Sequence, residues 1–387
     1  MQTEPTPKLQ GGFSPLGMWA FSIGTSIGWG SFIVTCNAYL KTSGVLGTLF
    51  GMLVGLAVIL VVTWNLQYMI RNCQSAGGIY TFARETCGRD LGFLAGWFVL
   101  LTYFAILWAN ITSVPLFARF FFGDAFQFGH HYTVFGYEVW FGEGLLSMAA
   151  VALIGLLCAR GSRHINRIMI TSALVFSAGF TICALAAIFL HGRAFSYSPL
   201  YLEGAMPFSQ IVHIAAISPW AFIGFENVSH FSEEYDFPVK KVRTVLIWSV
   251  VFATAFYILV SLLSVSAYPP EYKSWIDYIR DMGNLSGIKA VPAFYAAHHY
   301  MGGLGVSILL LSLLGVILTS LIGNLLALSR LIYAVGREGD APACFKRLSR
   351  DGVPVRAILF IVLVSLAIPF LGRTAIGWIV DVTTLGA

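Results

Sequence analysis

Long apolar stretches separated by short charged clusters dominate the chain. A helix that crosses a bilayer needs about 20 apolar residues, and stretches without Asp, Glu, Lys or Arg recur at about that length. They cover 9–40, 42–70, 91–118, 144–159, 168–192, 204–225, 244–270, 290–329 and 357–372. A tenth begins at residue 374 and is interrupted by Asp381. None alternates with the period of two that is typical of an outer-membrane barrel. The pattern predicts an all-α polytopic membrane protein.

Composition supports this prediction and excludes other classes. Of the 387 residues, 57% are hydrophobic and 11% are charged, whereas soluble domains carry about 25% charged residues. The net charge of +5 is spread too thinly for a nucleic-acid partner. The six cysteines lack metal spacing and are interpreted as buried apolar residues. His298 and His299 lack a third ligand, so we expect no metal or other cofactor. The apolar stretches lead us to expect a lipid bilayer around the chain.

The distribution of basic residues predicts the orientation. With a cytoplasmic N-terminus, 16 of the 23 Lys and Arg residues face the cytoplasm and 7 face outward. Cytoplasmic loops carry the excess of basic residues in membrane proteins. Residues 1–12 are polar and do not resemble a signal peptide. We therefore expect a multi-pass protein of the cell membrane, with 1–12 as a cytoplasmic segment.

Glycines interrupt the first apolar stretch. Gly24, Gly28 and Gly30 lie mid-span within 22–33. One interpretation is a packing face, because Gly24 and Gly28 form a GxxxG motif. The other is an unwound segment whose free N–H groups bind an anion. Small polar residues favour the second interpretation, because they can satisfy an opened backbone; these are Thr25, Ser26 and Ser31.

A second interruption falls in the sixth apolar stretch. Pro219 removes a helical donor, Gly224 relaxes the backbone, and Glu226 follows in an apolar context. An intramembrane carboxylate is either functional or bonded to a neighbouring helix. Two broken helices five spans apart fit an inverted repeat of five plus five helices, with a site between the repeats. We place the repeats at 13–193 and 204–387.

Four motifs are spread along the chain: 27–32 (IGWGSF), 75–84 with the following Gly88 and Gly96-Trp97, 220–226 (WAFIGFE), and 329–345 with Gly352-Val-Pro354. Together they resemble the amino acid–polyamine–organocation (APC) superfamily of secondary transporters, which share the LeuT-type fold. Two departures are visible. Trp29 replaces a small residue, and the chain ends early in helix ten, so we expect the second repeat to be incomplete.

The resemblance implies a substrate site between helices one and six. A zwitterionic substrate would place its carboxylate on backbone N–H groups and its ammonium on backbone carbonyls. The residues that match the N–H side are Gly28, Trp29, Gly30 and Ser31, and those that match the carbonyl side are Ser26, Ala221, Phe222 and Ile223. Trp220 would close over the substrate as an aromatic gate, unless it is a packing residue.

Several other polar residues have two interpretations each. Asn110 and Asn324 contact the substrate side chain or bridge helices. Thr319 and Ser320 help to bind sodium, or bond to their own helix. Glu226 couples protonation to the conformational cycle, or forms a permanent ion pair. The coupling ion is thus a proton or sodium.

The leading hypothesis is a secondary active transporter that moves amino acids or related amines by alternating access with ion coupling. An exchanger and a transporter-like nutrient sensor are the alternatives. A channel would need a repeated pore-lining pattern, and an enzyme would need clustered catalytic side chains at one membrane face. Neither is visible, so we expect no enzymatic activity.

Overall fold

The structure is a computed structural model that describes residues 9, 11–191 and 196–384. The predicted segment 1–12 therefore lies almost entirely outside the described residues. Within the described part, the chain forms helices and one short hairpin. The α-helices are α1 (Pro15–Ser26), α2 (Gly30–Val34), α3 (Lys41–Asn72), α4 (Ile79–Cys87), α5 (Arg89–Ile111), α6 (Val114–Phe122), α7 (Phe141–Ala159), α8 (Ser162–Leu190), α9 (Pro207–Ile217), α10 (Val242–Val265), α11 (Trp275–Asp281), α12 (Pro292–Glu338), α13 (Val355–Ser365) and α14 (Arg373–Thr384). The strands are β1 (His131–Val134) and β2 (Tyr137–Trp140).

Seven helical segments within the described part are long and apolar enough to cross a membrane. The sequence predicts nine complete stretches and the start of a tenth. The first break accounts for one of the missing segments, and the short ninth and tenth stretches account for the others. α1 is only 12 residues long because it ends at Ser26. After the break, the first stretch continues into the second as one segment, Gly30–Asn72. The ninth stretch forms the shorter apolar helix Val355–Leu371.

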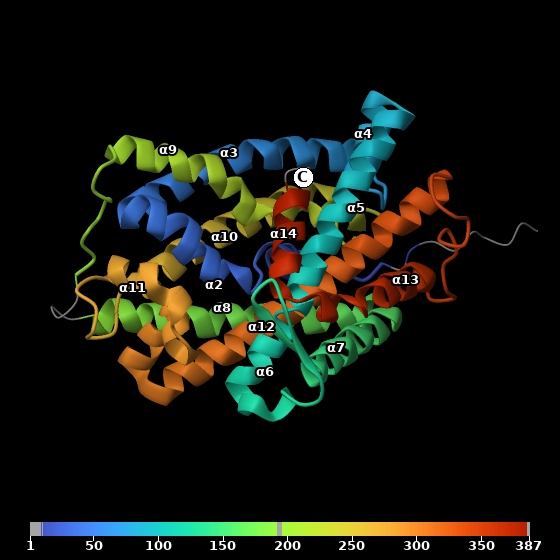
Figure 1. The fold of residues 1–387 in the computed structure, drawn as a ribbon. Coiled ribbons are helices and arrows are strands. Elements are labelled where there is room, and N and C mark those ends of the chain that lie inside the picture. Colours follow the sequence, from blue (N-terminus) through green and yellow to red (C-terminus); the bar gives the residue numbers. More distant parts are fainter. Residues whose placement is uncertain (1–8, 10, 192–195, 385–387) are drawn as a thin grey trace, which may run out of the picture.

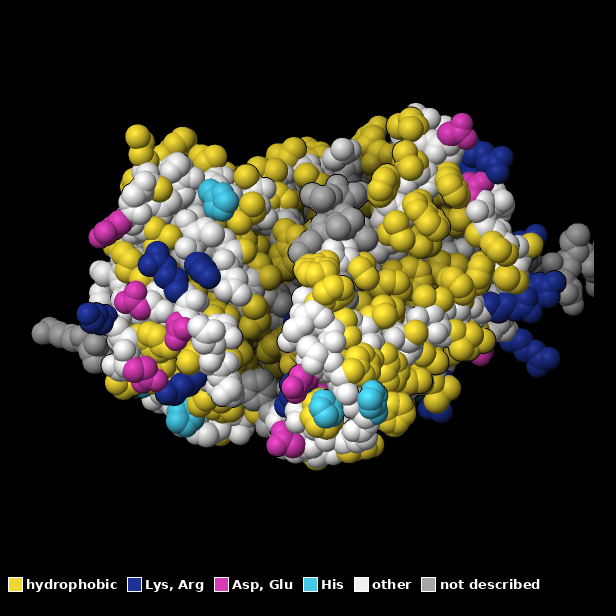
Figure 2. Space-filling view, in the orientation of Figure 1, with side chains coloured by type: hydrophobic (Ala, Val, Ile, Leu, Met, Phe, Trp, Pro, Cys, Tyr) yellow, Lys and Arg dark blue, Asp and Glu magenta, His cyan; other side chains and the backbone are white. Residues whose placement is uncertain are grey.

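The long helices α3, α8 and α12 run along the length of the molecule (Figure 1). α4 and the loop after α12 lie at the right-hand end, and α11 lies at the other end. Hydrophobic side chains cover much of the surface between the ends (Figure 2). Lys and Arg side chains lie at both ends, and a prominent group of them lies at the right-hand end. We call this the basic end. The basic residues of α4 and of the loop after α12 share this end, which agrees with the positive-inside pattern for these two segments.

A β-hairpin between α6 and α7 adds to the predicted all-α architecture. Its strands are antiparallel, with His131 opposite Trp140. Phe135 and Gly136 both have positive φ, at 49° and 80°, which is the backbone of a tight two-residue hairpin turn. The Tyr132 hydroxyl donates to the Phe370 carbonyl at 2.5 Å. The hairpin therefore fixes the chain just before α14.

The structure corrects the interpretation of two cysteines. Cys36, Cys158 and Cys183 are buried, as expected, and Cys73 is half-buried. Cys87 and Cys344 are exposed. Cys87 ends α4 and Cys344 lies in the loop after α12, both outside the packed bundle. Apolar burial therefore does not apply to these two residues.

Candidate functional site

The two predicted helix breaks lie against each other. α1 ends at Ser26, Ile27 is extended (φ −102°, ψ 106°), and the helix resumes at Gly30. In the sixth stretch, α9 gives way to a 3₁₀ segment, Ser218–Phe222, and a second one, Phe225–Phe231, follows. The Thr25 hydroxyl donates to the Gly224 carbonyl at 2.7 Å. This bond joins the two breaks directly.

Gly224 is required by this contact. Its φ is +106°, a backbone angle that residues with a side chain rarely adopt. A Cβ at this position would also lie 2.6 Å from the Thr25 carbonyl oxygen. The first break shows both predicted roles of its glycines. Gly24 is inside α1, where a Cβ would meet Thr319 at 2.5 Å, so it serves packing, whereas Gly28 and Gly30 belong to the break.

A cavity of about 230 Å³ lies where the breaks meet. We call it the candidate cavity. Its lining is Thr25, Ser26, Gly28, Trp29, Gly30, Ser31, Val34, Ile106, Ala109, Asn110, Trp220, Ile223, Tyr257, Ser320, Arg373 and Gly377. Most of the sequence-predicted site residues are among these. The predicted residues outside the lining are Ala221, Phe222, Glu226, Thr319 and Asn324.

Free backbone groups face this region from both breaks. The N–H groups of Gly28 and Trp29 find no acceptor among the described residues, and the Ile223 carbonyl finds no donor there. The Ser31 N–H is different, because it donates to the Gly28 carbonyl at 3.1 Å. The Gly30 N–H, at the first position of α2, also finds no acceptor among the described residues. Gly28, Trp29 and Gly30 are thus available as donors for an anion, and Ser31 is the one predicted donor that is already bonded.

Polar side chains complete the cavity wall. The Asn110 amide nitrogen donates to the Ile106 carbonyl at 2.8 Å. The side-chain oxygen of Asn110 lies next to Gly28. The Tyr257 hydroxyl, from α10, lies 2.9 Å from the Ser31 hydroxyl. The Trp29 indole N–H is buried without a partner among the described residues. Tyr257 was not a sequence-predicted residue, because no local motif marks it.

Two of the three predicted polar residues on α12 lie behind the cavity. Thr319 donates to the carbonyls of Gly315 and Val316 at 2.9 and 3.0 Å. The Asn324 amide donates to the Ser320 carbonyl at 2.8 Å, within its own helix, and its oxygen is buried without a described partner. Only Ser320 reaches the lining. The helix-bonded alternative therefore describes Thr319 in this conformation.

Trp220 lies between two cavities. It lines the candidate cavity and also a larger one of about 900 Å³ between α3, α5 and the sixth stretch. Ile223 is shared in the same way. Trp220 therefore borders both cavities, and its role as a gate stays a prediction.

Glu226 lines the larger cavity and bonds directly to the break. One carboxylate oxygen accepts from the Gly224 N–H at 2.8 Å, and the other accepts from the Tyr103 hydroxyl at 3.1 Å. Tyr103 in turn lies 3.4 Å from the His230 ring. Among the described residues, no Lys or Arg forms an ion pair with Glu226. The alternative of a permanent ion pair therefore has no partner in the described part.

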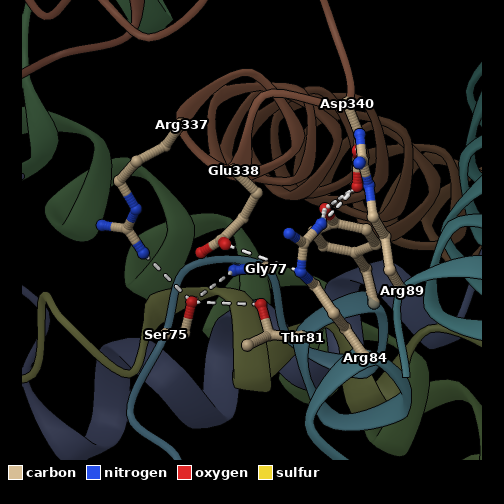
Figure 3. A network of polar contacts seen from close by, with 9 residues as sticks. Ser75, Gly77, Thr81, Arg84, Arg89, Arg337, Glu338 and Asp340 are labelled. Atoms are coloured by element: carbon tan, nitrogen blue, oxygen red, sulfur yellow. Dashed lines mark hydrogen bonds and ion pairs between the residues drawn. The ribbon is translucent and has the colours of Figure 1, made fainter. Parts of the chain in front are cut away.

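A polar network at the basic end joins two of the sequence motifs (Figure 3). Asp340 accepts from Arg84, from Arg89 at 2.7 and 2.9 Å, and from Tyr80 at 2.8 Å. We call these four residues the Asp340 cluster. Burial and the hydrogen bond to Asp340 raise the pKa of Tyr80 to about 12. Burial alone would raise the pKa of Asp340, but the hydrogen bonds from Arg89 and Tyr80 and the charges of Arg84 and Arg89 lower it.

A second part of the network reaches the end of the sixth stretch. Arg337 donates to Glu233 at 2.8 Å and to the Ser75 hydroxyl at 3.1 Å. Deeper in the bundle, Arg330 and Glu234 form a bidentate pair at 2.8 and 3.0 Å. The loop before α4, the segment that follows the sixth stretch and the end of α12 are therefore tied together.

The solved structures show the class of this fold. A Na⁺-coupled sialic acid symporter, solved in a substrate-bound outward-open state, matches with a TM-score of 0.57 and 13% sequence identity. The match covers 96% of this chain and 76% of that chain. Together with the two joined helix breaks, it shows a LeuT-type transporter fold.

The sequence comparisons show the family. The amino acid permease family model matches residues 17–386, so the chain belongs to the amino acid permease family and is a secondary transporter. It is 24% identical to the methylthioribose transporter of Bacillus subtilis over 336 residues, which is 84% of this chain and 67% of that protein. It is 23% identical to the branched-chain amino acid permease of Bacillus subtilis, with coverage of 84% and 67%. It is 24% identical to the gamma-aminobutyric acid permease of Escherichia coli, with coverage of 92% and 72%.

Proposed function

We propose that this permease moves an amino acid or a related amine across the cell membrane through the candidate cavity. The observation that carries the proposal is the pair of joined breaks, which present unpartnered N–H groups and an unpartnered carbonyl to one cavity. The substrate carboxylate binds the N–H groups of Gly28 and Trp29. The ammonium binds the Ile223 and Ser26 carbonyls. This arrangement matches the charges at helix ends, which are positive at N-termini and negative at C-termini.

The coupling is proposed to use protons and Glu226. Its carboxylate accepts from the Gly224 N–H, and Gly224 is held to Thr25. Protonation of Glu226 would weaken the bond to Gly224 and so change the backbone that surrounds the substrate. The sodium alternative at Thr319 and Ser320 has less support, because the Thr319 hydroxyl donates within its own helix.

A binding screen followed by counterflow tests the proposal. Twenty amino acids and common polyamines are added to the purified protein, because a bound substrate raises apparent thermal stability by mass action. The ligand that stabilises most is then loaded into liposomes, and counterflow of its labelled form is measured. Binding with counterflow supports the proposal. Binding without counterflow would favour the nutrient-sensor alternative, and an absence of both would contradict an amino acid or amine substrate.

A further inference from the structure

Arg373 lines the wall of the candidate cavity and forms no ion pair with any described residue. It is the first residue of α14, and Gly377 from the same helix also lines the cavity. One terminal nitrogen, Nη1, is buried and has no hydrogen-bond partner among the described residues. Nor does any described carboxylate lie within ion-pair distance of the guanidinium. A buried charge without a partner is unfavourable, so a bound anion would be stabilised here.

The neighbours of Arg373 do not neutralise it. Arg373 also lines a second, small cavity together with Tyr137 and Glu143. Glu143 is already held by Arg119 through two bonds of 2.6 and 2.8 Å. Both carboxylate oxygens of Glu143 are thus bonded to Arg119, and neither forms an ion pair with Arg373. One positive charge remains for the candidate cavity.

The rest of the cavity lining contains no opposing charge. Among its described residues, Arg373 is the one Lys, Arg, Asp or Glu, since Glu226 belongs to the neighbouring cavity. The unpartnered N–H groups of Gly28 and Trp29 already provide for the substrate α-carboxylate under the proposed function. A planar guanidinium on a different helix offers a second carboxylate site of bidentate geometry.

We infer that the transported substrate is an amino acid with an anionic side chain, and that Arg373 binds its side-chain carboxylate. This inference rests on the proposed function and narrows its substrate class to dicarboxylic amino acids. Arg373 is thus a specificity-determining residue. It acts by distinguishing a carboxylate from the amide of the same shape.

Transport of matched acid and amide pairs tests the inference. Uptake of labelled L-glutamate, L-aspartate, L-glutamine and L-asparagine is measured in liposomes containing the protein. We expect the parent protein to prefer each acid over its amide by about tenfold or more, the size of a charge-assisted hydrogen bond. Arg373→Gln should abolish this preference by lowering uptake of the acids far more than uptake of the amides. Arg373→Lys should keep part of the preference, because it retains the charge without the planar fork.

The control is Arg280→Gln, which makes the same change of net charge at an exposed position on α11. It should leave the acid-to-amide ratio unchanged. Equal losses for acids and amides in Arg373→Gln would overturn the inference, because Arg373 would then bind the shared α-carboxylate or only support the fold. Greater thermal stabilisation of the parent by the acids than by the amides would support the inference without a variant. A parent that transports neutral amino acids but not the acids overturns this inference alone, whereas transport of no amino acid or amine overturns the proposed function.

Discussion

Gly28 and Gly30 differ in their surroundings, although both belong to the first break. A Cβ at Gly28 would lie 3.0 Å from the Asn110 side-chain oxygen, so a substitution there disturbs the cavity wall. A Cβ at Gly30 would meet nothing within 4 Å, and Gly30 lines the candidate cavity. A larger residue at position 30 therefore enters the space proposed for the substrate without a clash in the fold.

Gly30→Val should lower substrate affinity by about tenfold or more and leave folding intact, because Val is a better helix former than Gly by a few tenths of a kcal/mol. Affinity and thermal stability are measured separately on the purified protein. Gly303→Val is the matched control, since Gly303 is an exposed helical glycine whose Cβ would also meet nothing within 4 Å. Normal affinity in a stable Gly30→Val protein would leave position 30 with no role in binding.

Glu226→Gln should give a transporter that still binds substrate but has a flattened pH profile. The amide keeps the shape of the carboxyl group and can still accept from the Gly224 N–H, but it cannot release a proton. Uptake is measured from pH 5 to 8, a range in which protonation can drive conformational changes in proteins. Tyr103→Phe is the control, because it removes one bond to Glu226 and keeps the titrating group, so its profile should still depend on pH. An unchanged profile in Glu226→Gln would assign coupling to another group.

The breaks themselves could be predicted from the sequence, and their partners could not. Glycine and proline act on their own backbone, so 27–30 and 219–224 carry a local signal. Tyr257 and Arg373 come from helices far along the chain and follow no motif. Asn324 resembled a site residue because it is polar in an apolar stretch, yet its amide bonds to its own helix. A sequence without its helix packing cannot show which way such a side chain faces.

At the scale of elements, the Asp340 cluster joins α4 and the start of α5 to the end of α12. Asp340 is 4% exposed and Arg84 is 22% exposed, so these bonds are partly shielded from water. Charge-assisted hydrogen bonds of this kind contribute about 1.5–3 kcal/mol each. The cluster therefore stabilises the conformation in which α4 and the start of α5 lie against the end of α12.

Asp340→Asn should shift the population toward conformations open at the basic end by about tenfold. The readout is the labelling rate of Ser22→Cys, which replaces a buried residue of α1 beneath the cavity, in a protein whose exposed Cys87 and Cys344 are changed to Ser. Glu271→Gln is the control, because it breaks a 2.6 Å pair with Lys289 at the opposite end. Equal labelling rates in both variants would show that the cluster does not control closure.

The charge state of Asp340 also determines the pH range in which the Asp340 cluster can respond to pH. Its pKa is lowered below the usual 3.8, so the carboxylate is ionised throughout the neutral range. A lowered pKa contributes stability that is present above the unfolded value and is lost as pH falls through the folded value. The cluster should therefore persist from neutral pH down to about pH 4. Any pH dependence of transport near neutrality must come from another group.

At the scale of the whole molecule, two native cysteines report the orientation. Cys87 and Cys344 are exposed, and the other four are buried or half-buried. Both exposed cysteines lie at the basic end, which the positive-inside pattern predicts to be cytoplasmic. A membrane-impermeant maleimide should label them only after cells are permeabilised. Lys273→Cys, at an exposed position just before α11, should be labelled on intact cells, and the reverse result would invert the proposed topology.

The order of the helices can be predicted from the sequence more readily than the residues at which the helices begin and end. Charge-free stretches predict the order of the helices, because lipid excludes unpaired charge. They could not show that 9–40 and 42–70 form one continuous segment after the break, since a single Lys41 separates them. The repeat limits at 13–193 and 204–387 remain predictions, as do the roles of the two halves.

The Arg330–Glu234 pair constrains how this sequence can change over time. The two side chains are 1% and 0% exposed, and loss of one partner from such a buried pair costs about 3–5 kcal/mol. That cost is a large part of the total stability of an ordinary domain. Neither position can drift alone, although an apolar pair in both positions would be tolerated. These two residues, 96 positions apart, should therefore change together during evolution. Related sequences should either keep both charges or have replaced both.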